Sequence, residues 1–186
     1  MASNSRYGTI SIVGGTGALG GGLARRWAKA GFPVVIGSRT ADKAVAAAAE
    51  IRAAFPGASI QGLGNLDAAR TGNVVVLTVP FAQQRATLES IQSALAGKIL
   101  VDTTVPLVPP KVARVQLPKE GAAALIAQQI AGDGVAVVAA FHNVAADSLH
   151  TDEALDCDVL VTGNKADARD VVVELARAAG LRAWHA

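Results

Sequence analysis

The fold of this chain is decided by ISIVGGTGALGGG, residues 10–22. Its first residues are apolar and suit a buried strand, and the residues that follow it suit a helix. Between the two lies a glycine-rich turn with the spacing Gly15-x-Gly17-x-x-Gly20. This order of strand, turn and helix is typical of the first half of a dinucleotide-binding βαβ unit. The alternative is a purely structural turn, because glycine-rich turns are common.

Each glycine of the turn has its own predicted purpose. Gly15 permits a tight turn out of the strand, Gly17 lets a pyrophosphate approach the backbone, and Gly20 lets the helix lie close to the strand. The N-terminus of the helix adds free N–H groups and the positive end of a dipole. The turn therefore contributes a predicted cofactor-binding set of Gly15, Gly17, Ala18, Leu19 and Gly20.

Composition limits the class of protein. The 186 residues are 51% hydrophobic and 17% charged, which predicts one compact domain over residues 1–186. The basic residues are scattered, so we expect no nucleic-acid partner. No signal peptide or membrane span is expected. The single cysteine excludes an internal disulfide and fits a reducing compartment, so we expect a cytoplasmic protein.

Apolar runs alternate with helical patterns along the whole chain. This alternation predicts a Rossmann-like α/β fold, in which helices cover both faces of a doubly wound, mostly parallel sheet in three αβα layers. We expect Trp27, on the first helix, to lie in the core. The predicted strands are residues 8–13, 33–37, 59–62, 73–79, 98–101, 135–140, 156–161 and 181–184. The predicted helices are residues 17–30, 41–55, 65–70, 82–95, 121–131 and 165–179.

The end of the second predicted strand indicates which dinucleotide binds. An NAD-preferring site usually has an acidic residue there for the ribose hydroxyls. Here the position holds Ser38 and Arg39, so nothing acidic repels a 2′-phosphate and Arg39 can pair with it. We therefore predict NADP(H). Lys43 lies where a cation is unfavourable for the helix dipole, and it is either another anion ligand or a solvated surface lysine.

Two later stretches are candidates for the substrate side. Residues 102–119 contain four prolines, which exclude a regular helix or central strand. This loop follows the carboxyl end of a strand, and it is either a wall of the substrate site or a surface excursion. At another strand end, His142 and Asn143 could orient a substrate ring or donate to a developing anion. The alternative is a histidine that fixes the following turn.

The residues exclude several kinds of catalytic site. The only tyrosine, Tyr7, precedes the first strand, so no Tyr-x-x-x-Lys dehydrogenase motif is present. The histidines and the cysteine lack zinc spacing, so no metal site is expected. Cys157 is assigned to packing, and His150 and His185 to the surface. Direct hydride transfer between two bound rings fits this shortage of acid–base residues, because such a transfer needs alignment of the rings more than a catalytic proton donor.

The sequence resembles the NADPH-dependent reductases of coenzyme F-420, a deazaflavin, in GGTGALGGGLARRWAKAG and the following VVIGSRTADKA. The resemblance continues in VVLTVPF, VVAAFHN and CDVLVTGNKADAR, and it covers nearly the whole chain. It implies a homodimeric oxidoreductase that passes a hydride, in either direction, between NADP(H) and the deazaflavin. It also implies that Thr16, Ser38, Arg39 and Lys43 hold the NADP phosphates.

The resemblance also assigns the other end of the site. Val79 and Pro80 would lie beside the nicotinamide, and His142 and Asn143 would approach the two rings. Members of this family usually continue past the last strand with a Gly-Pro-Leu segment and a helix, and we expect this chain, which stops at Ala186, to lack them. Two alternatives stay open: an NADP(H)-binding sensor without turnover, and a reductase of another small acceptor such as a flavin or a metal chelate.

Overall fold

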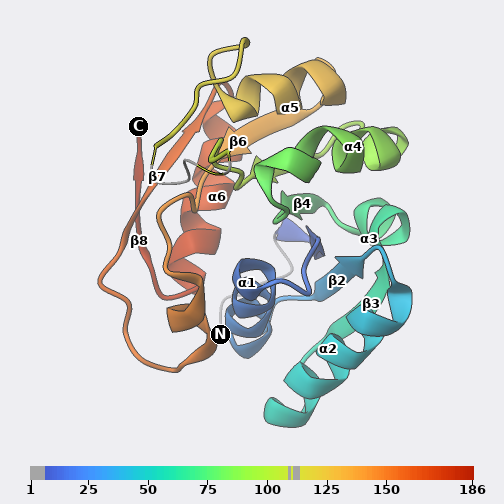
Figure 1. Cartoon of the computed structure of the whole chain (residues 1–186). Helices are drawn as coiled ribbons and strands as arrows, with labels where there is room; N and C mark the ends of the chain where they lie inside the picture. The colour runs from blue at the N-terminus through green and yellow to red at the C-terminus, as the bar shows by residue number, and fades with distance from the viewer. Residues whose placement is uncertain (1–6, 109, 111–113) are drawn as a thin grey trace.

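The computed structural model describes residues 7–108, 110 and 114–186, and eight strands in this part of the chain form one sheet (Figure 1). Their order is β3-β2-β1-β4-β5-β6-β7-β8. The strands are β1 (Ile10–Val13), β2 (Val34–Ser38), β3 (Ile60–Gly64), β4 (Val74–Leu77), β5 (Ile99–Asp102), β6 (Ala136–Ala139), β7 (Asp158–Gly163) and β8 (Arg182–His185). The helices are α1 (Ala18–Lys29), α2 (Ala41–Ala54), α3 (Asn65–Thr71), α4 (Phe81–Ile91), α5 (Ala123–Ala131) and α6 (Ala166–Ala178), with short 3-10 helices η2 (Gln92–Ala94) and η3 (Ala146–His150).

The sheet changes winding direction between β1 and β4. β1 pairs in parallel with β2 on one side and with β4 on the other, so that Ile10 lies opposite both Val34 and Val74. A crevice forms beyond the carboxyl ends of the strands at such a switch point. Pairing stays parallel as far as β6, and β7 then runs antiparallel to β6. The predicted doubly wound, mostly parallel sheet is confirmed.

Two apolar clusters, one on each face of the sheet, make the three layers. Alternate residues of each strand point to opposite faces, as the pleat requires. On one face Val74 and Val76 of β4 pack in a cluster with side chains of α1, α2 and α6. On the other face Val75 and Leu77 pack with side chains of α3, α4 and α5. The predicted αβα arrangement is therefore confirmed.

Helix α1 is the element that joins the early and late parts of the chain. Trp27 is fully buried, as predicted, and its indole N–H donates to the carbonyl of Leu175 on α6 at 2.8 Å. Its ring meets the ring of Phe141 edge to face, with 6.1 Å between centroids. Gly22 lies against η3, where a Cβ would come within 2.5 Å of the Leu149 Cβ. Because Gly22 has no Cβ, the short helix η3 can pack directly against α1.

The proline-rich loop differs from the prediction at its start. Asp102 is still part of β5, and Asp102, Thr103 and Thr104 are all buried. Farther on, Leu107 and Val115 form an isolated antiparallel bridge. The predicted role of this loop also involves residues 109 and 111–113, which lie outside the described part of the chain.

None of the helices in the described residues is long and apolar enough to cross a lipid bilayer.

Candidate functional site

The glycine-rich turn combines one left-handed residue with several close contacts. Gly14 has a positive φ of 75°. Gly15 is required for another reason, because a Cβ there would come within 2.7 Å of the Ile12 carbonyl oxygen. At Gly20 a Cβ would lie 2.5 Å from the Thr78 hydroxyl oxygen and 2.7 Å from the Gly15 Cα. The turn and the start of α1 thus pack directly onto the end of β4.

A cavity of about 300 Å³ opens beyond the carboxyl ends of β1, β2 and β4, at the switch point of the sheet. It brings together seven of the predicted cofactor-binding residues: Thr16, Gly17, Ser38, Arg39, Lys43, Val79 and Pro80. Its other lining residues are Gly14, Thr40, Asn65, Thr78, Gln83 and Thr87. We refer to it below as the switch-point cavity.

The far end of the switch-point cavity carries two cations and a buried hydroxyl. Ser38 is buried, and its hydroxyl oxygen accepts a hydrogen bond from the Thr40 N–H at 3.3 Å. The hydroxyl proton is still available to donate. Arg39 and Lys43 are exposed, and within the described residues neither forms an ion pair. The arrangement suits a phosphate group, which accepts hydrogen bonds and carries negative charge.

Asn65 is a lining residue that sequence reasoning missed. Its side-chain oxygen accepts a hydrogen bond from the N–H of Gly14 at 3.2 Å, so it fixes the first residue of the turn. The sequence predicts only a short capped helix over residues 65–70 here. In the structure the residue before the helix is Gly64, and Asn65 is the first helical residue. Only the pairing of β2 with β3, which ends at Gly64, brings it to the turn.

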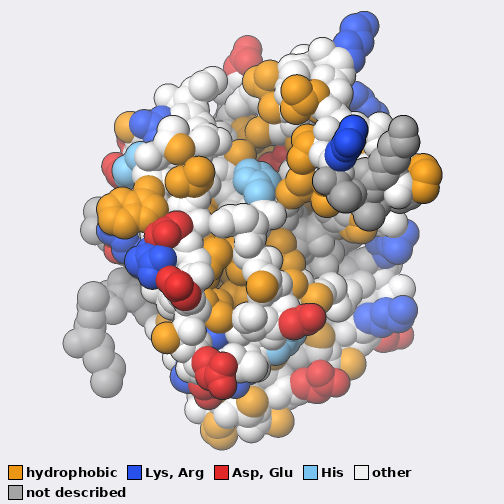
Figure 2. Space-filling view, turned by 60° about the vertical axis from the view of Figure 1, so that its left-hand side comes forward, with side chains coloured by type: hydrophobic (Ala, Val, Ile, Leu, Met, Phe, Trp, Pro, Cys, Tyr) orange, Lys and Arg blue, Asp and Glu red, His pale blue; other side chains and the backbone are white. Residues whose placement is uncertain are grey.

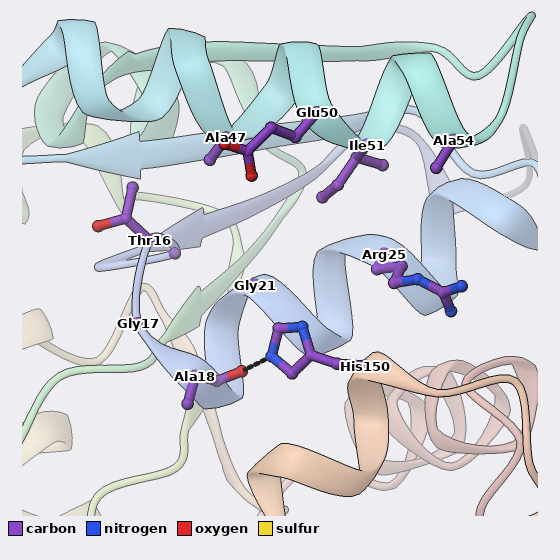
Figure 3. A pocket seen from close by; sticks show the side chains of 11 residues that line it. Thr16, Gly17, Ala18, Gly21, Arg25, Ala47, Glu50, Ile51, Ala54 and His150 are labelled. Atoms are coloured by element: carbon purple, nitrogen blue, oxygen red, sulfur yellow. Dashed lines mark hydrogen bonds between the residues drawn. The ribbon is translucent and has the colours of Figure 1, made fainter.

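A second cavity, of about 320 Å³, lies on the other side of the turn, between α1, α2 and η3 (Figure 3). It is lined by Gly15, Thr16, Gly17, Ala18, Gly21, Arg25, Ala47, Glu50, Ile51, Ala54 and His150. The Nε2 atom of His150 lies 2.8 Å from the carbonyl oxygen of Ala18. Because a carbonyl only accepts, this nitrogen carries the proton. His150 is exposed, as predicted, but it also holds the first turn of α1.

Basic side chains of α1 hold residues 144–153, which contain η3, against this helix. The Arg26 guanidinium donates to the carbonyls of Ser148, Leu149, Glu153 and Ala179, at 3.0 to 3.4 Å. Asp152 forms ion pairs with Arg25 at 2.7 Å and with Lys29 at 3.0 Å. The hydrogen bonds from these two cations lower the pKa of Asp152 to about 2.

The turn after β6 has an unusual backbone. Phe141 adopts a left-handed conformation with φ of 65°, which is rare for a bulky residue and marks local strain. Its side chain is buried against Trp27, which holds it there. His142 and Asn143 follow directly and are exposed. The Asn143 amide donates to the Asp158 carbonyl at 2.9 Å, so it also secures the turn.

The environment of this turn combines apolar and titratable groups. Figure 2 shows hydrophobic side chains gathered in the middle of the face that it presents. Burial raises the pKa of Asp102, against the opposing effects of the Thr104 and Gln84 hydrogen bonds and the His142 charge. Although His142 is exposed at the surface, desolvation lowers its pKa, while the charge and the backbone of Asp102 raise it. Asp102 and His142 therefore influence each other.

The remaining predicted residues are distributed as follows. Gly15 and Ala18 line the second cavity, while Leu19 and Gly20 line neither of the two. His142 and Asn143 also lie outside both. The described residues hold no group of three or more His, Cys, Asp or Glu side chains that could bind a metal ion. Cys157 is only half-buried, because it precedes β7 instead of lying within it.

Comparison with known proteins identifies the family. Residues 9–106 match the family described as NADP oxidoreductase, coenzyme F420-dependent. The chain is 42% identical over 174 residues to the F420-dependent NADP reductase of Methanothermobacter thermautotrophicus. The aligned region covers 90% of this chain and 75% of the relative. The chain belongs to this family. The Methanocaldococcus jannaschii enzyme of the same name is 39% identical over 175 residues, 90% of this chain and 78% of that protein.

Solved structures with a similar fold were also found. A hypothetical protein from Sinorhizobium meliloti superposes with a TM-score of 0.77 at 26% identity, over 98% of this chain and 86% of that one. A pyrroline-5-carboxylate reductase from Coxiella burnetii has a TM-score of 0.67 at 16% identity, over 96% of this chain and 58% of that one. The second likeness concerns the fold alone.

Proposed function

We propose that this protein is an NADP(H)-dependent oxidoreductase that transfers a hydride between the nicotinamide and a deazaflavin of the coenzyme F-420 type. The observation that carries the proposal is the switch-point cavity. The glycine-rich turn lies at one end, and Ser38 lies at the other with the cations Arg39 and Lys43, neither of which forms an ion pair within the described residues. Family membership and relatives named F420-dependent NADP reductases support the choice of acceptor.

The residues present fit NADP better than NAD. The 2′-phosphate of NADP adds negative charge at the adenosine ribose, and Arg39 and Lys43 supply positive charge beside Ser38 at the end of β2. Among the described residues, no acidic side chain lines the switch-point cavity. The turn and the α1 N-terminus would hold the pyrophosphate, and Val79 and Pro80 would contact the nicotinamide end. When bound, NADPH supplies the hydride.

On this proposal the acceptor side is the turn after β6. His142 and Asn143 would border the acceptor ring, held by the strained Phe141 and by the bond from Asn143 to β7. A hydride transfer needs the donor and acceptor carbons within van der Waals contact, so alignment is the main contribution of the protein. We further propose a single domain, because one sheet runs through the described chain. A cytoplasmic homodimer is part of the same proposal and rests on the family resemblance.

The test is an anaerobic mixture of the protein with NADPH and oxidised coenzyme F-420, followed by the visible absorbance of the deazaflavin. We expect bleaching of the deazaflavin together with NADPH oxidation in equal amounts. The same assay with a flavin and with a ferric chelate tests other acceptors. Tight NADPH binding without turnover of any acceptor would contradict the proposal and favour a sensor.

A further inference from the structure

Asp102 is a buried carboxyl group that the proposed function does not use. Its side chain is fully buried at the carboxyl end of β5, beside the turn that carries His142. Burying an ionised carboxylate costs several kcal/mol, on the order of the stability of a small domain, unless charge and hydrogen bonds compensate it. Within the described residues no lysine or arginine pairs with it.

A network of neutral donors holds this carboxylate in one orientation. The Gln84 amide donates to its Oδ2 atom at 2.8 Å, and the Thr104 N–H donates to its Oδ1 atom at 3.0 Å. Gln84 is itself buried, and its amide also donates to the Ala123 carbonyl at 2.9 Å, so α4, α5 and β5 meet at this point. A carboxylate held by two donors, one of which is itself anchored to α5, presents its charge at a constant place.

The pairing of β5 with β6 places His142 near Asp102. β5 and β6 pair in parallel with Asp102 opposite Ala139, and the Ala140 N–H donates to the Asp102 carbonyl at 3.2 Å. The left-handed Phe141 then turns the chain, and His142 contacts the backbone of Asp102. Desolvation lowers the pKa of His142 and the charge of Asp102 opposes this, while the charge of His142 opposes the burial that raises the pKa of Asp102.

We infer that Asp102 is a positioning residue for His142: it fixes the imidazole at the acceptor edge and stabilises its positive charge there. An imidazolium in this place would stabilise negative charge on the acceptor ring as the hydride arrives, and it can supply the proton that accompanies the hydride. The overall reaction consumes NADPH, the oxidised ring and one proton, and it yields NADP⁺ and the dihydro ring. The catalytic part of this inference rests on the proposed function, whereas the link between the two side chains does not.

The link is tested by histidine NMR on the full chain without any ligand. The sequence has three histidines, so a His142→Gln variant assigns the relevant signal. Asp102→Asn removes the charge but keeps the size of the side chain. We expect the titration midpoint of His142 to fall by about 0.5 to 1 unit, with His150 and His185 unchanged. Asp133→Asn, an exposed aspartate just before β6, is the matched control and should leave all three midpoints unchanged.

A second variant covers the case in which Asp102→Asn does not fold. Gln84→Met removes one donor to the carboxylate, so Asp102 takes up a proton more readily and the midpoint of His142 should fall as well. With NADPH and coenzyme F-420, Asp102→Asn should lower kcat about tenfold and leave the KM for NADPH unchanged. A His142 midpoint that is unmoved in the folded variants overturns the inference. Absence of turnover in the natural protein would overturn the proposed function instead, and the titrations would still test the link.

Discussion

The two ends of the proposed site are built in different ways. The residues proposed to surround the NADP phosphates in the switch-point cavity come from one short stretch, Gly14 to Lys43, with Asn65 and the end of β4 closing it. The acceptor edge joins Gln84, Asp102 and His142, which three separate elements supply. The first end depends on local backbone geometry, and the second depends on the assembled sheet. Mutations should therefore separate binding at the first end from turnover at the second.

The largest effect is expected at Gly20. A Cβ there would meet backbone at 2.7 Å, so Gly20→Ala must shift the turn. Overpacking of this kind costs roughly 1–3 kcal/mol, and we expect NADPH affinity to fall up to about a hundredfold. Isothermal calorimetry measures this. Gly21→Ala is the matched control, because its Cβ would be no closer than 3.5 Å to a neighbour, and it should bind NADPH normally. Equal effects of the two variants would contradict the geometric argument.

Arg39→Gln tests whether the phosphate end selects the cofactor. Loss of a charged hydrogen bond costs roughly 1.5–3 kcal/mol, so NADPH affinity should fall by a factor of about 10 to 100. NADH affinity should not change, since NADH lacks the 2′-phosphate. Competitive fluorescence titrations of both dinucleotides give the two constants. Arg70→Gln on α3, an exposed arginine paired with Asp67, is the control and should alter neither. A parallel loss of both affinities would show that Arg39 only supports the fold.

At the other end His142→Gln should affect turnover alone. We expect kcat with coenzyme F-420 to fall about tenfold, because an ordered polar group at the ring is lost. NADPH affinity should stay within about twofold, since His142 lies outside the switch-point cavity. Steady-state kinetics beside direct binding measurements separate the two quantities. His185→Gln, at an exposed position on β8, serves as the control. A rise in the NADPH dissociation constant would mean that the two ends are not separate.

The smallest effect concerns segment 144–153, which connects the two ends. The pKa of Asp152 is lowered to about 2 in the folded protein, from 3.8. Its ion pairs therefore contribute stability above about pH 4, and this contribution is lost as the pH falls toward 2. Because the group is exposed, Asp152→Asn should lower Tm only slightly at neutral pH. When Tm is measured from pH 6 to pH 2, the values for the natural protein and for Asp152→Asn should converge at the acidic end. A constant difference at every pH would exclude an electrostatic cause.

The two ends also differ in how far the sequence predicts them. The alternation of apolar runs predicts the sheet and its layers, and the glycine spacing with Ser38 and Arg39 predicts residues that meet in the switch-point cavity. These signals are local. The sequence predicts that Asp102 begins an irregular loop, because a single aspartate after an apolar run gives no sign of burial by α4 and α5. The contact of His150 with Ala18 depends on η3 lying against Gly22, which no local pattern reveals.

The bonds that α1 makes with the far end of the chain have a consequence for protein synthesis. Arg26 and Trp27 reach carbonyls 122 to 153 residues downstream, at Ser148, Leu149, Glu153, Leu175 and Ala179. At ordinary translation rates these acceptors leave the ribosome on the order of ten seconds after the helix does. During that interval the nascent helix carries an indole and a guanidinium with no native acceptors. The glycine-rich turn, although made first, should therefore reach its final rigidity only after residues 148–179 have emerged.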